Sequence, residues 1–334
     1  MELWKEVRTE ARPREVTCAD SLARGNARRA LRLAVVGRFG DAMQALGSLG
    51  CASPSDEVAY QEMIHRHPQQ DVPQWSDSMP APLVVDTQSV LAALKGFPRG
   101  SSPGSSKLRA QLLVEAVCGS TAPAATACLE ELTRFTNHFL AGRADRRLAP
   151  WLLGAPLTAL VKKPTGYRPI AVGEVLRRLI SRIGCAAVKA ELPNLFLPAG
   201  QVGVGVPGGL EAAIHSLRAC ITDNGAEEDL CCLKLDMQNA FNECSREVLL
   251  RQTRQHMSKL FPWVQWCYTC AGELHFGSHR IKSSAGVQQG DPLGPILFSL
   301  VLLELTSGIR QLDGTRLSLW YLDDGTIIGT RTAV

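Results

Sequence analysis

The fold of this chain is decided by the stretch Leu317-Ser318-Leu319-Trp320-Tyr321-Leu322-Asp323-Asp324-Gly325-Thr326-Ile327-Ile328. A run of β-forming residues leads into two adjacent carboxylates and a glycine, and a second β-forming run follows. This order predicts a β-hairpin with the acidic side chains at its turn. Because Asp-Gly is a common signal for a short hairpin, an ordinary turn is the first interpretation of this motif taken alone.

A second acidic strand end changes that interpretation. The apolar run over residues 230–235 predicts a buried strand and finishes in Asp236. If the two strands pair side by side, the carboxylates of Asp236, Asp323 and Asp324 come together, and like charges that close repel unless cations hold them. Mg²⁺ prefers oxygen ligands and usually binds one or two carboxylates plus substrate phosphates. Two such ions about 3.5 to 4 Å apart would stabilise both oxygens of a phosphoryl displacement, so the pattern predicts nucleotidyl transfer.

Short β-type runs alternate with longer helical patterns after Pro150. The predicted helices cover residues 175–192, 209–221, 245–257 and 292–309, and the predicted strands and hairpins cover residues 157–161, 230–235, 274–287 and 317–328. Before Pro150 the spacing predicts helices, separated by a proline-rich linker over residues 67–82 and a Gly- and Pro-rich loop over residues 96–106. Together these elements predict an α+β fold.

The composition excludes several classes of protein. With 334 residues, of which 45% are hydrophobic and 20% charged, the chain matches globular proteins and not disordered, collagen-like or disulfide-stapled ones. Eleven cysteines without a framework spacing, and an N-terminus without an apolar signal segment, predict a reducing, intracellular compartment, either nucleus or cytoplasm. The longest strongly apolar run, residues 296–303, is far shorter than the roughly 20 residues of a membrane span, so none is expected.

Four motifs carry a resemblance to reverse transcriptases. Tyr321-Leu322-Asp323-Asp324 resembles their catalytic hairpin, and Asp236-Met237-Gln238-Asn239-Ala240-Phe241 resembles their first palm motif. Gly286-Val287-Gln288-Gln289-Gly290-Asp291-Pro292-Leu293-Gly294-Pro295 is similar to the stretch before the long palm helix. Leu160-Val161-Lys162-Lys163-Pro164 with Tyr167-Arg168-Pro169-Ile170 is similar to the fingers motif. The motifs stand in the expected order, and the loop over residues 201–209 fits the enzymes of non-LTR (non-long-terminal-repeat) retrotransposons.

The resemblance runs from about residue 84 to the end and implies a right-hand polymerase. Its α+β fold would contain fingers and a palm, in which an antiparallel sheet packs on helices. Residues 1–80 would form a helical, basic N-terminal extension and linker, residues 81–230 the fingers and the start of the palm, and residues 231–334 the palm. Only ten residues follow Asp324, so we expect a chain truncated after the Tyr-Leu-Asp-Asp motif, without a thumb.

The resemblance also implies roles for the palm residues. Asp236 and Asp323 would be ligands shared by two Mg²⁺ ions, with Asp324 beside them and the backbone carbonyl of Met237 completing a site; Mn²⁺ is an alternative ion. Phe241 would lie under the sugar of the incoming nucleotide, where a flat ring leaves no room for a 2′-hydroxyl. The implied activity is RNA-directed DNA polymerisation, with an RNA template, a DNA primer and deoxynucleoside triphosphates as partners.

The fingers and the loop before the palm helix would bind the nucleotide. Arg168, with Lys162 or Lys163, would hold the triphosphate, since cations placed where negative charge develops lower the barrier. Gln289 and Gly290 would help to position the templating base and the incoming nucleotide.

Charge supports the fingers assignment independently of the resemblance. Residues 143–189 contain ten Lys or Arg against two Asp or Glu, an excess of +8, while the whole chain has a net charge of only +4. Such an excess predicts salt-sensitive contacts with template phosphates. The contacts would come from Arg143, Arg146, Arg147, Arg177, Arg178 and Arg182. The alternative is a helix face that is merely solvated.

Two rival functions stay open at this point. Asn242 stands where the family often has Asp after the aromatic residue, but that position is not a metal ligand. The first rival is a catalytically inactive, truncated remnant that acts at most as a nucleic-acid-binding protein. The second is an enzyme that copies RNA into RNA, and Phe241 argues against it.

Overall fold

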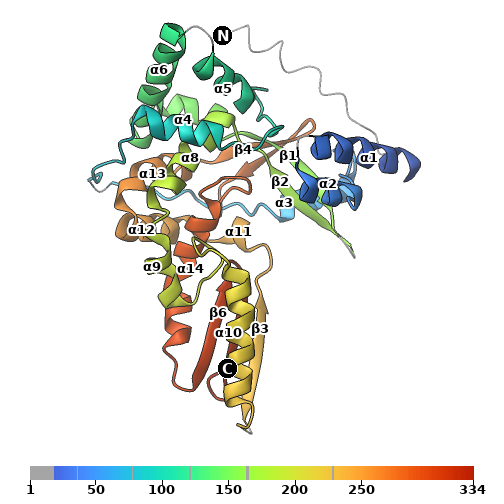
Figure 1. Cartoon of the computed structure of the whole chain (residues 1–334), viewed down its shortest axis with the longest axis vertical. Coiled ribbons are helices and arrows are strands. Elements are labelled where there is room, and N and C mark those ends of the chain that lie inside the picture. Colours follow the sequence, from blue (N-terminus) through green and yellow to red (C-terminus); the bar gives the residue numbers. More distant parts are fainter. Residues whose placement is uncertain (1–18, 36, 77, 120–121, 163–164, 228) are drawn as a thin grey trace.

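The computed structural model of this chain describes residues 19–35, 37–76, 78–119, 122–162, 165–227 and 229–334. Figure 1 shows an elongated molecule. Most helices gather at one end, and the helix α10 (Gly209–Asn224) lies along strands at the other. The strands of the described residues form two separate sheets, and the predicted catalytic acids belong to the second.

The first sheet consists of β1 (Ala155–Val161), β2 (Tyr167–Ala171), β4 (Gly272–Phe276) and β5 (His279–Ser283), in the order β2-β1-β4-β5. β1 pairs antiparallel with β2 and parallel with β4. Buried residues alternate along β1 and β4, as expected when one face of a sheet lies on a core. The core on that face includes Ala59 and Met63 of α3 (Glu57–His65), together with Leu274 and Phe276.

The N-terminal segment is joined to this sheet. α1 (Ala19–Val35) and α2 (Phe39–Leu46) pack as a pair. Asp56 caps the N-terminus of α3, since its side chain accepts hydrogen bonds from two backbone amides. The described residues between 66 and 86 form no helix or strand. They cross the molecule and are fixed by Gln69, which donates to the Lys282 carbonyl at 3.0 Å, and by the Leu83 amide, which donates to the Lys259 carbonyl at 2.8 Å.

The helical body consists of α4 (Thr87–Lys95), α5 (Ala110–Cys118), α6 (Ala122–Leu140), α7 (Ala149–Leu152), α8 (Val175–Val188), α9 (Leu192–Phe196), α12 (Arg246–His256), α13 (Phe261–Tyr268) and α14 (Gly294–Arg310). Its core includes the stacked indoles of Trp263 and Trp266, whose centroids lie 5.7 Å apart. α14 contributes many residues to the same core, which explains its apolar sequence. Among the residues described, no helix is both long and apolar enough to cross a membrane.

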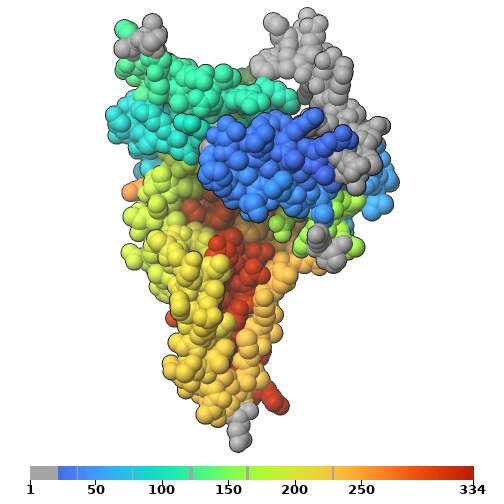
Figure 2. Space-filling view, turned by 45° about the vertical axis from the view of Figure 1, so that its right-hand side comes forward, coloured from blue at the N-terminus to red at the C-terminus, as the bar shows by residue number. Residues whose placement is uncertain are grey.

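The second sheet has the order β3-β7-β6 and is antiparallel throughout. It consists of β3 (Leu230–Asp236), β6 (Thr315–Tyr321) and β7 (Asp324–Thr330). β6, β7 and the turn Leu322-Asp323 between them are called the acidic hairpin below. Figure 2 shows the C-terminal residues (red) at the surface between the yellow residues of α10 and the orange residues of β3.

The predicted α+β fold, with fingers and palm, is confirmed. The helix predicted over residues 245–257 is α12, and the hydroxyl of Ser245 caps it by accepting a hydrogen bond from the Val248 amide at 3.3 Å. The prediction that residues 230–235 form a buried strand is wrong. β3 is an edge strand, so Cys232 and Lys234 are exposed and the other residues of that run only half-buried. The domain boundaries at residues 80 and 230 stay predictions.

Candidate active site

The two acidic strand ends meet in the structure. Asp236, the last residue of β3, is paired with Asp324, the first residue of β7. Directly opposed residues of antiparallel strands have Cα atoms about 4.5 to 5.5 Å apart. Asp323 directly precedes Asp324 in the chain, so their Cα atoms are about 3.8 Å apart. The Cα atoms of Asp236 and Asp323 are therefore no more than about 10 Å apart. All three carboxylates lie at one end of the second sheet.

The charges of these acids act on one another. Burial raises the pKa of Asp323 above its ordinary value, and the carboxylates of Asp324 and Asp236 raise it further. A hydrogen bond from its own backbone amide and the guanidinium of Arg168 lower it in part. Three neighbouring carboxylates, which offer only oxygen as donor atom, fit a hard divalent cation. In the described part of the chain, no three or more Asp, Glu, His or Cys side chains lie close enough together to form a complete metal-binding site.

The turn of the acidic hairpin has two residues, Leu322 and Asp323, between the paired residues Tyr321 and Asp324. Leu322 has φ of 57°, in the left-handed region that bulky residues rarely adopt. Gly325 follows, and a Cβ atom there would lie 2.7 Å from the indole of Trp320. The packing of Trp320 therefore requires a glycine directly after the two acids.

The first palm motif continues into α11 (Ala240–Glu243). The ring of Phe241 is half-buried and stacks on Phe298 of α14, with centroids 4.4 Å apart and an angle of 19° between the planes. The amide of Asn242, where the family often has Asp, is buried and donates to the side chain of Asn239 at 2.9 Å. Asn242 therefore stabilises the turn after Met237.

The loop with Gln289 and Gly290 lies between the first sheet and α11. Gly290 has φ of 98°, and a Cβ atom there would lie 2.3 Å from the carbonyl oxygen of Ala171 at the end of β2. Gly286, at the other end of the loop, is equally close to the carbonyl of Phe241. Gln289 is half-buried and Gly290 exposed. The loop thus connects the predicted nucleotide-binding strand with the predicted palm.

A buried polar cluster, which no pattern in the sequence predicts, holds this loop. Asp291 accepts a hydrogen bond from Arg177 at 2.9 Å and another from the hydroxyl of Tyr268 at 3.0 Å. Arg246 donates to the carbonyls of Gly286 and Ser283, and burial lowers the pKa of Arg246 to about 10. Both guanidinium groups lie over the ring of Tyr268, that of Arg177 5.9 Å and that of Arg246 5.3 Å from its centroid.

Arg177 corrects one prediction. It is 3% exposed and also donates to the side chain of Gln288, so it does not face template phosphates. Burial alone would lower its pKa, but Asp291, together with the smaller contributions of Cys267 and Tyr268, outweighs that effect and raises the pKa. The reason for the error is that charge counted along the chain includes cations paired inside the core.

The other five arginines differ in their surroundings. Arg143 is exposed, and Arg147 is exposed beside Asp145, at 2.6 Å. Arg146 donates to the Trp266 carbonyl at 2.8 Å and to the side chain of Gln265 at 2.9 Å, so its guanidinium fixes α13.

Arg178 and Arg182 of α8 both lie over the ring of Phe97, at 5.6 and 4.9 Å. They donate to the carbonyls of Ser102 and Gly96. Their contacts therefore hold the loop over residues 96–106 against the fingers helix.

The cations predicted to bind the triphosphate lie on the β1–β2 hairpin. Arg168 is paired with Leu160 across this hairpin and is exposed, and Lys162 follows β1 and is also exposed. Lys163 lies outside the described residues. The guanidinium of Arg168 also lowers the pKa of Asp323, by less than burial and the two neighbouring carboxylates raise it.

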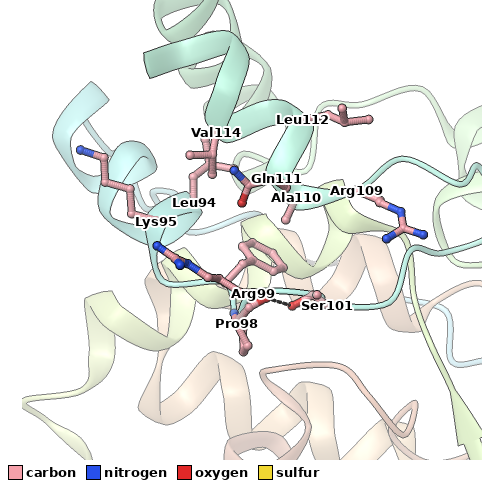
Figure 3. Close-up of a pocket in the computed structure, with 12 residues that line it drawn as sticks. Leu94, Lys95, Pro98, Arg99, Ser101, Arg109, Ala110, Gln111, Leu112 and Val114 are labelled. Carbon is pink, nitrogen blue, oxygen red and sulfur yellow. Dashed lines mark hydrogen bonds between the residues drawn. The ribbon is translucent and has the colours of Figure 1, made fainter. Parts of the chain in front are cut away.

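A hollow of about 620 Å³ lies between the end of α4, the loop that follows it and the start of α5. Figure 3 shows Lys95, Arg99 and Arg109 around it, with the apolar side chains of Leu94 and Val114. Its glycines and prolines predict only that this loop ends a helix. The signal that was available is the three basic residues that flank its glycines and prolines.

Comparisons with known proteins agree with the four motifs. The family described as reverse transcriptase (RNA-dependent DNA polymerase) matches residues 160–333, which is more than half of the 334 residues. The SLACS 132 kDa protein of a retrotransposable element of Trypanosoma brucei gambiense is 27% identical over 257 residues, 74% of this chain and 20% of that protein. The retrovirus-related Pol polyprotein from the type-1 retrotransposable element R2 of Popillia japonica is 24% identical over 243 residues, 69% of this chain and 31% of that protein.

The chain thus spans about a fifth to a third of the length of these curated relatives. Among solved structures, telomerase from Candida albicans is similar at 13% identity and a TM-score of 0.40, over 54% of this chain and 38% of that chain. Apo telomerase from Candida tropicalis is similar at 13% identity and a TM-score of 0.42, over 56% and 45%. The two curated relatives support the resemblance to the enzymes of non-LTR retrotransposons, and the family match includes every predicted catalytic acid. The chain belongs to the reverse transcriptase (RNA-dependent DNA polymerase) family.

Proposed function

We propose that this chain carries the nucleotidyl-transfer site of an RNA-directed DNA polymerase from a retrotransposon-like element. The observation that carries the proposal is the pairing of Asp236 with Asp324, with Asp323 in the adjoining turn. The raised pKa of Asp323, to which both other acids contribute, supports a site made for cations.

Asp236 and Asp323 hold both metal ions in this proposal, with Asp324 beside them and the carbonyl of Met237 completing a site. Two Mg²⁺ ions, or Mn²⁺ in their place, supply Lewis-acid stabilisation of the entering and leaving oxygens when bound. The protein contributes the fixed spacing of the carboxylates, since they lie on two paired strands and a two-residue turn.

The incoming deoxynucleoside triphosphate lies between the β1–β2 hairpin and the acidic hairpin. Arg168 and Lys162, which are exposed on the first, bind its phosphates together with Lys163. Phe241, whose ring plane is fixed by its stacking on Phe298, excludes a 2′-hydroxyl. Gln289 and Gly290 complete the nucleotide pocket from the loop that the Asp291 cluster holds.

The RNA template and the DNA primer bind through exposed cations. Arg143 and Arg147 remain candidates from the sequence, and Lys95, Arg99 and Arg109 around the hollow of Figure 3 are further ones. Phosphate contacts of this kind do not depend on sequence and weaken with salt.

The test is primer extension on an RNA template, with the wild-type chain and Asp323→Asn compared at equal concentration. The proposal expects Mg²⁺-dependent addition of deoxynucleotides that is lost in the variant, because the carboxamide removes a charged metal ligand. Binding of the template–primer by filter retention should stay the same in both chains. Equal extension by both chains would contradict the proposal, and binding without extension by either would identify a nucleic-acid-binding remnant.

A further inference from the structure

The segment over residues 200–203 lies along the acidic hairpin like an additional strand. The Val202 amide donates to the Trp320 carbonyl at 2.8 Å, and the Trp320 amide donates to the Gly200 carbonyl at 2.9 Å. Gln201 forms a parallel bridge with Trp320. Gly200 has φ of 80°, and a Cβ atom there would lie 2.2 Å from the Ser318 carbonyl oxygen. The backbone of this segment is therefore fixed directly against β6.

The side chain of Gln201 reaches past the end of β6 to the turn. It is 1% exposed. Its oxygen accepts a hydrogen bond from the Leu322 amide at 2.9 Å, and its nitrogen donates to the Leu322 carbonyl at 3.1 Å. The oxygen also accepts from the Gly203 amide at 3.0 Å. One side-chain amide thus satisfies both backbone polar groups of a single residue, as a neighbouring strand would.

Leu322 needs such a partner. Its φ of 57° is unfavourable for a branched side chain, and its position in a two-residue turn leaves its amide and carbonyl outside the β6–β7 ladder. Polar backbone groups in a half-buried place are costly when unpaired. Asp323 is the next residue, so whatever fixes the peptide of Leu322 also fixes the start of Asp323.

We propose that Gln201 is a positioning residue, which holds the Leu322 peptide in its left-handed conformation and thereby sets the affinity of the Asp236, Asp323 and Asp324 carboxylates for divalent cations. The cation-affinity half rests on the proposed function, since it concerns the same acids. The positioning half does not, because it concerns only the conformation of the turn.

Two variants test it in the full chain. Gln201→Leu keeps the size of the side chain but removes both contacts to Leu322. Gly203→Ala leaves Gln201 in place, but its Cβ would lie 2.8 Å from the Leu322 amide nitrogen and would displace the turn. The matched control is Gln252→Leu on α12, since Gln252 is also 1% exposed and donates to Glu304.

Hydrogen exchange of the Leu322 amide tests the contact itself. We expect exchange to be about tenfold faster in both test variants, the size expected from the loss of one or two hydrogen bonds, and unchanged in Gln252→Leu. Equal exchange in wild type and Gln201→Leu would overturn the positioning role. This measurement needs no cation and no activity, so Gln201→Leu and Gly203→Ala together give a result even if one of them folds poorly.

Mn²⁺ binding, followed by electron paramagnetic resonance, tests the consequence. Wild type should bind Mn²⁺ more tightly than Asp323→Asn, and Gln201→Leu should bind about tenfold more weakly than wild type. Gln252→Leu should bind like wild type even where its melting temperature falls as far, which separates positioning from general loss of stability. Wild-type affinity in folded Gln201→Leu would refute the cation-affinity half. Binding that does not depend on Asp323 would refute that half together with the proposed function.

Discussion

At the scale of single residues, Asp323 is an acid whose negative charge is disfavoured by its surroundings. Its carboxylate is partly buried, stands beside two like charges and has a raised pKa. The same features that make it a cation ligand therefore make it unfavourable in the cation-free chain. Gly325 is a second residue whose identity is dictated by a neighbour, the indole of Trp320.

Replacing Asp323 by Asn should stabilise the cation-free protein near neutral pH. An acid whose pKa is raised on folding contributes most to stability below its unfolded pKa, and that contribution is lost as the pH rises through the folded pKa. At about pH 7 with a chelator, Asp323→Asn should melt at a higher temperature than wild type. Below about pH 3.5, where both states are largely protonated, the difference should shrink. A lower melting temperature of the variant at pH 7 would contradict the argument that the charge of Asp323 destabilises the cation-free protein.

Gly325→Ala should lower the free energy of unfolding by about 1 to 3 kcal/mol, because the new methyl group overlaps the indole of Trp320. Gly308→Ala on α14 is the control. A Cβ atom at that position meets nothing within 4 Å, and alanine is the better helix former by roughly 1 kcal/mol. Urea denaturation should therefore show opposite shifts for the two variants, and equal shifts would disprove the steric argument.

Elements are connected in this protein by buried polar side chains as well as by apolar packing. α8 and the loop before α14 meet at the Arg177–Asp291 pair, and Tyr268 of α13 donates to the same carboxylate. Arg246 fixes the far end of the loop from α12. Three helices thus determine where Gln289 and Gly290 lie, because Asp291, the residue after Gly290, is held by side chains that are far from it in sequence.

Arg177→Met should therefore destabilise the fold by about 3 to 5 kcal/mol, because Asp291 is left as a buried charge without its cation. In the double variant Arg177→Met, Asp291→Asn, part of that loss should be recovered, since the remaining carboxamide carries no charge. Chemical denaturation of the single and double variants measures both quantities. No recovery in the double variant would show that the loss comes from packing of the Arg177 side chain alone.

At the scale of elements, the helices and strands that depend on local sequence patterns could be predicted from the sequence. The helix over residues 245–257, the strand over residues 157–161 and the two acidic strand ends are encoded by local patterns, and each stands where it was expected. Burial was predicted less well, because the pairing of Arg177 with Asp291 and the exposure of β3 depend on residues far away in the chain. Gln201 escaped notice as a contact of the turn for the same reason, since Leu322 is 121 residues away.

At the scale of the whole molecule, the distribution of free cations is narrower than the sequence suggests. Of the six arginines predicted to contact a template, one is buried and three have guanidinium contacts that hold α13 or the loop over residues 96–106. Besides Arg143 and Arg147, exposed cations occur on the β1–β2 hairpin and around the hollow of Figure 3.

The salt dependence of single-strand binding should reveal this distribution. A plot of the logarithm of the association constant against the logarithm of the salt concentration has a negative slope. Changing Lys95, Arg99 and Arg109 together to Gln should make this slope less steep by about 2, the value for three lost phosphate contacts on a single strand. Arg146→Gln should leave the slope unchanged, because its guanidinium bonds to Trp266 and Gln265. Fluorescence anisotropy over a salt series measures both. An unchanged slope in the triple variant, or an equal fall in Arg146→Gln, would argue against this assignment of the cations.

The shared core of α3 and the first sheet bears on how the protein can be shortened for laboratory work. Ala59 and Met63 fill the space behind Leu274 and Phe276, and the Ala52 amide donates to the Ala159 carbonyl at 2.9 Å. A shortened protein that starts at residue 81, the predicted start of the fingers, would lack α3. The apolar face of the first sheet would then be exposed to solvent, which favours aggregation. A protein shortened only up to residue 50 retains α3 and keeps this face covered. Adding α3 to the shorter protein as a separate peptide should cover the face as well.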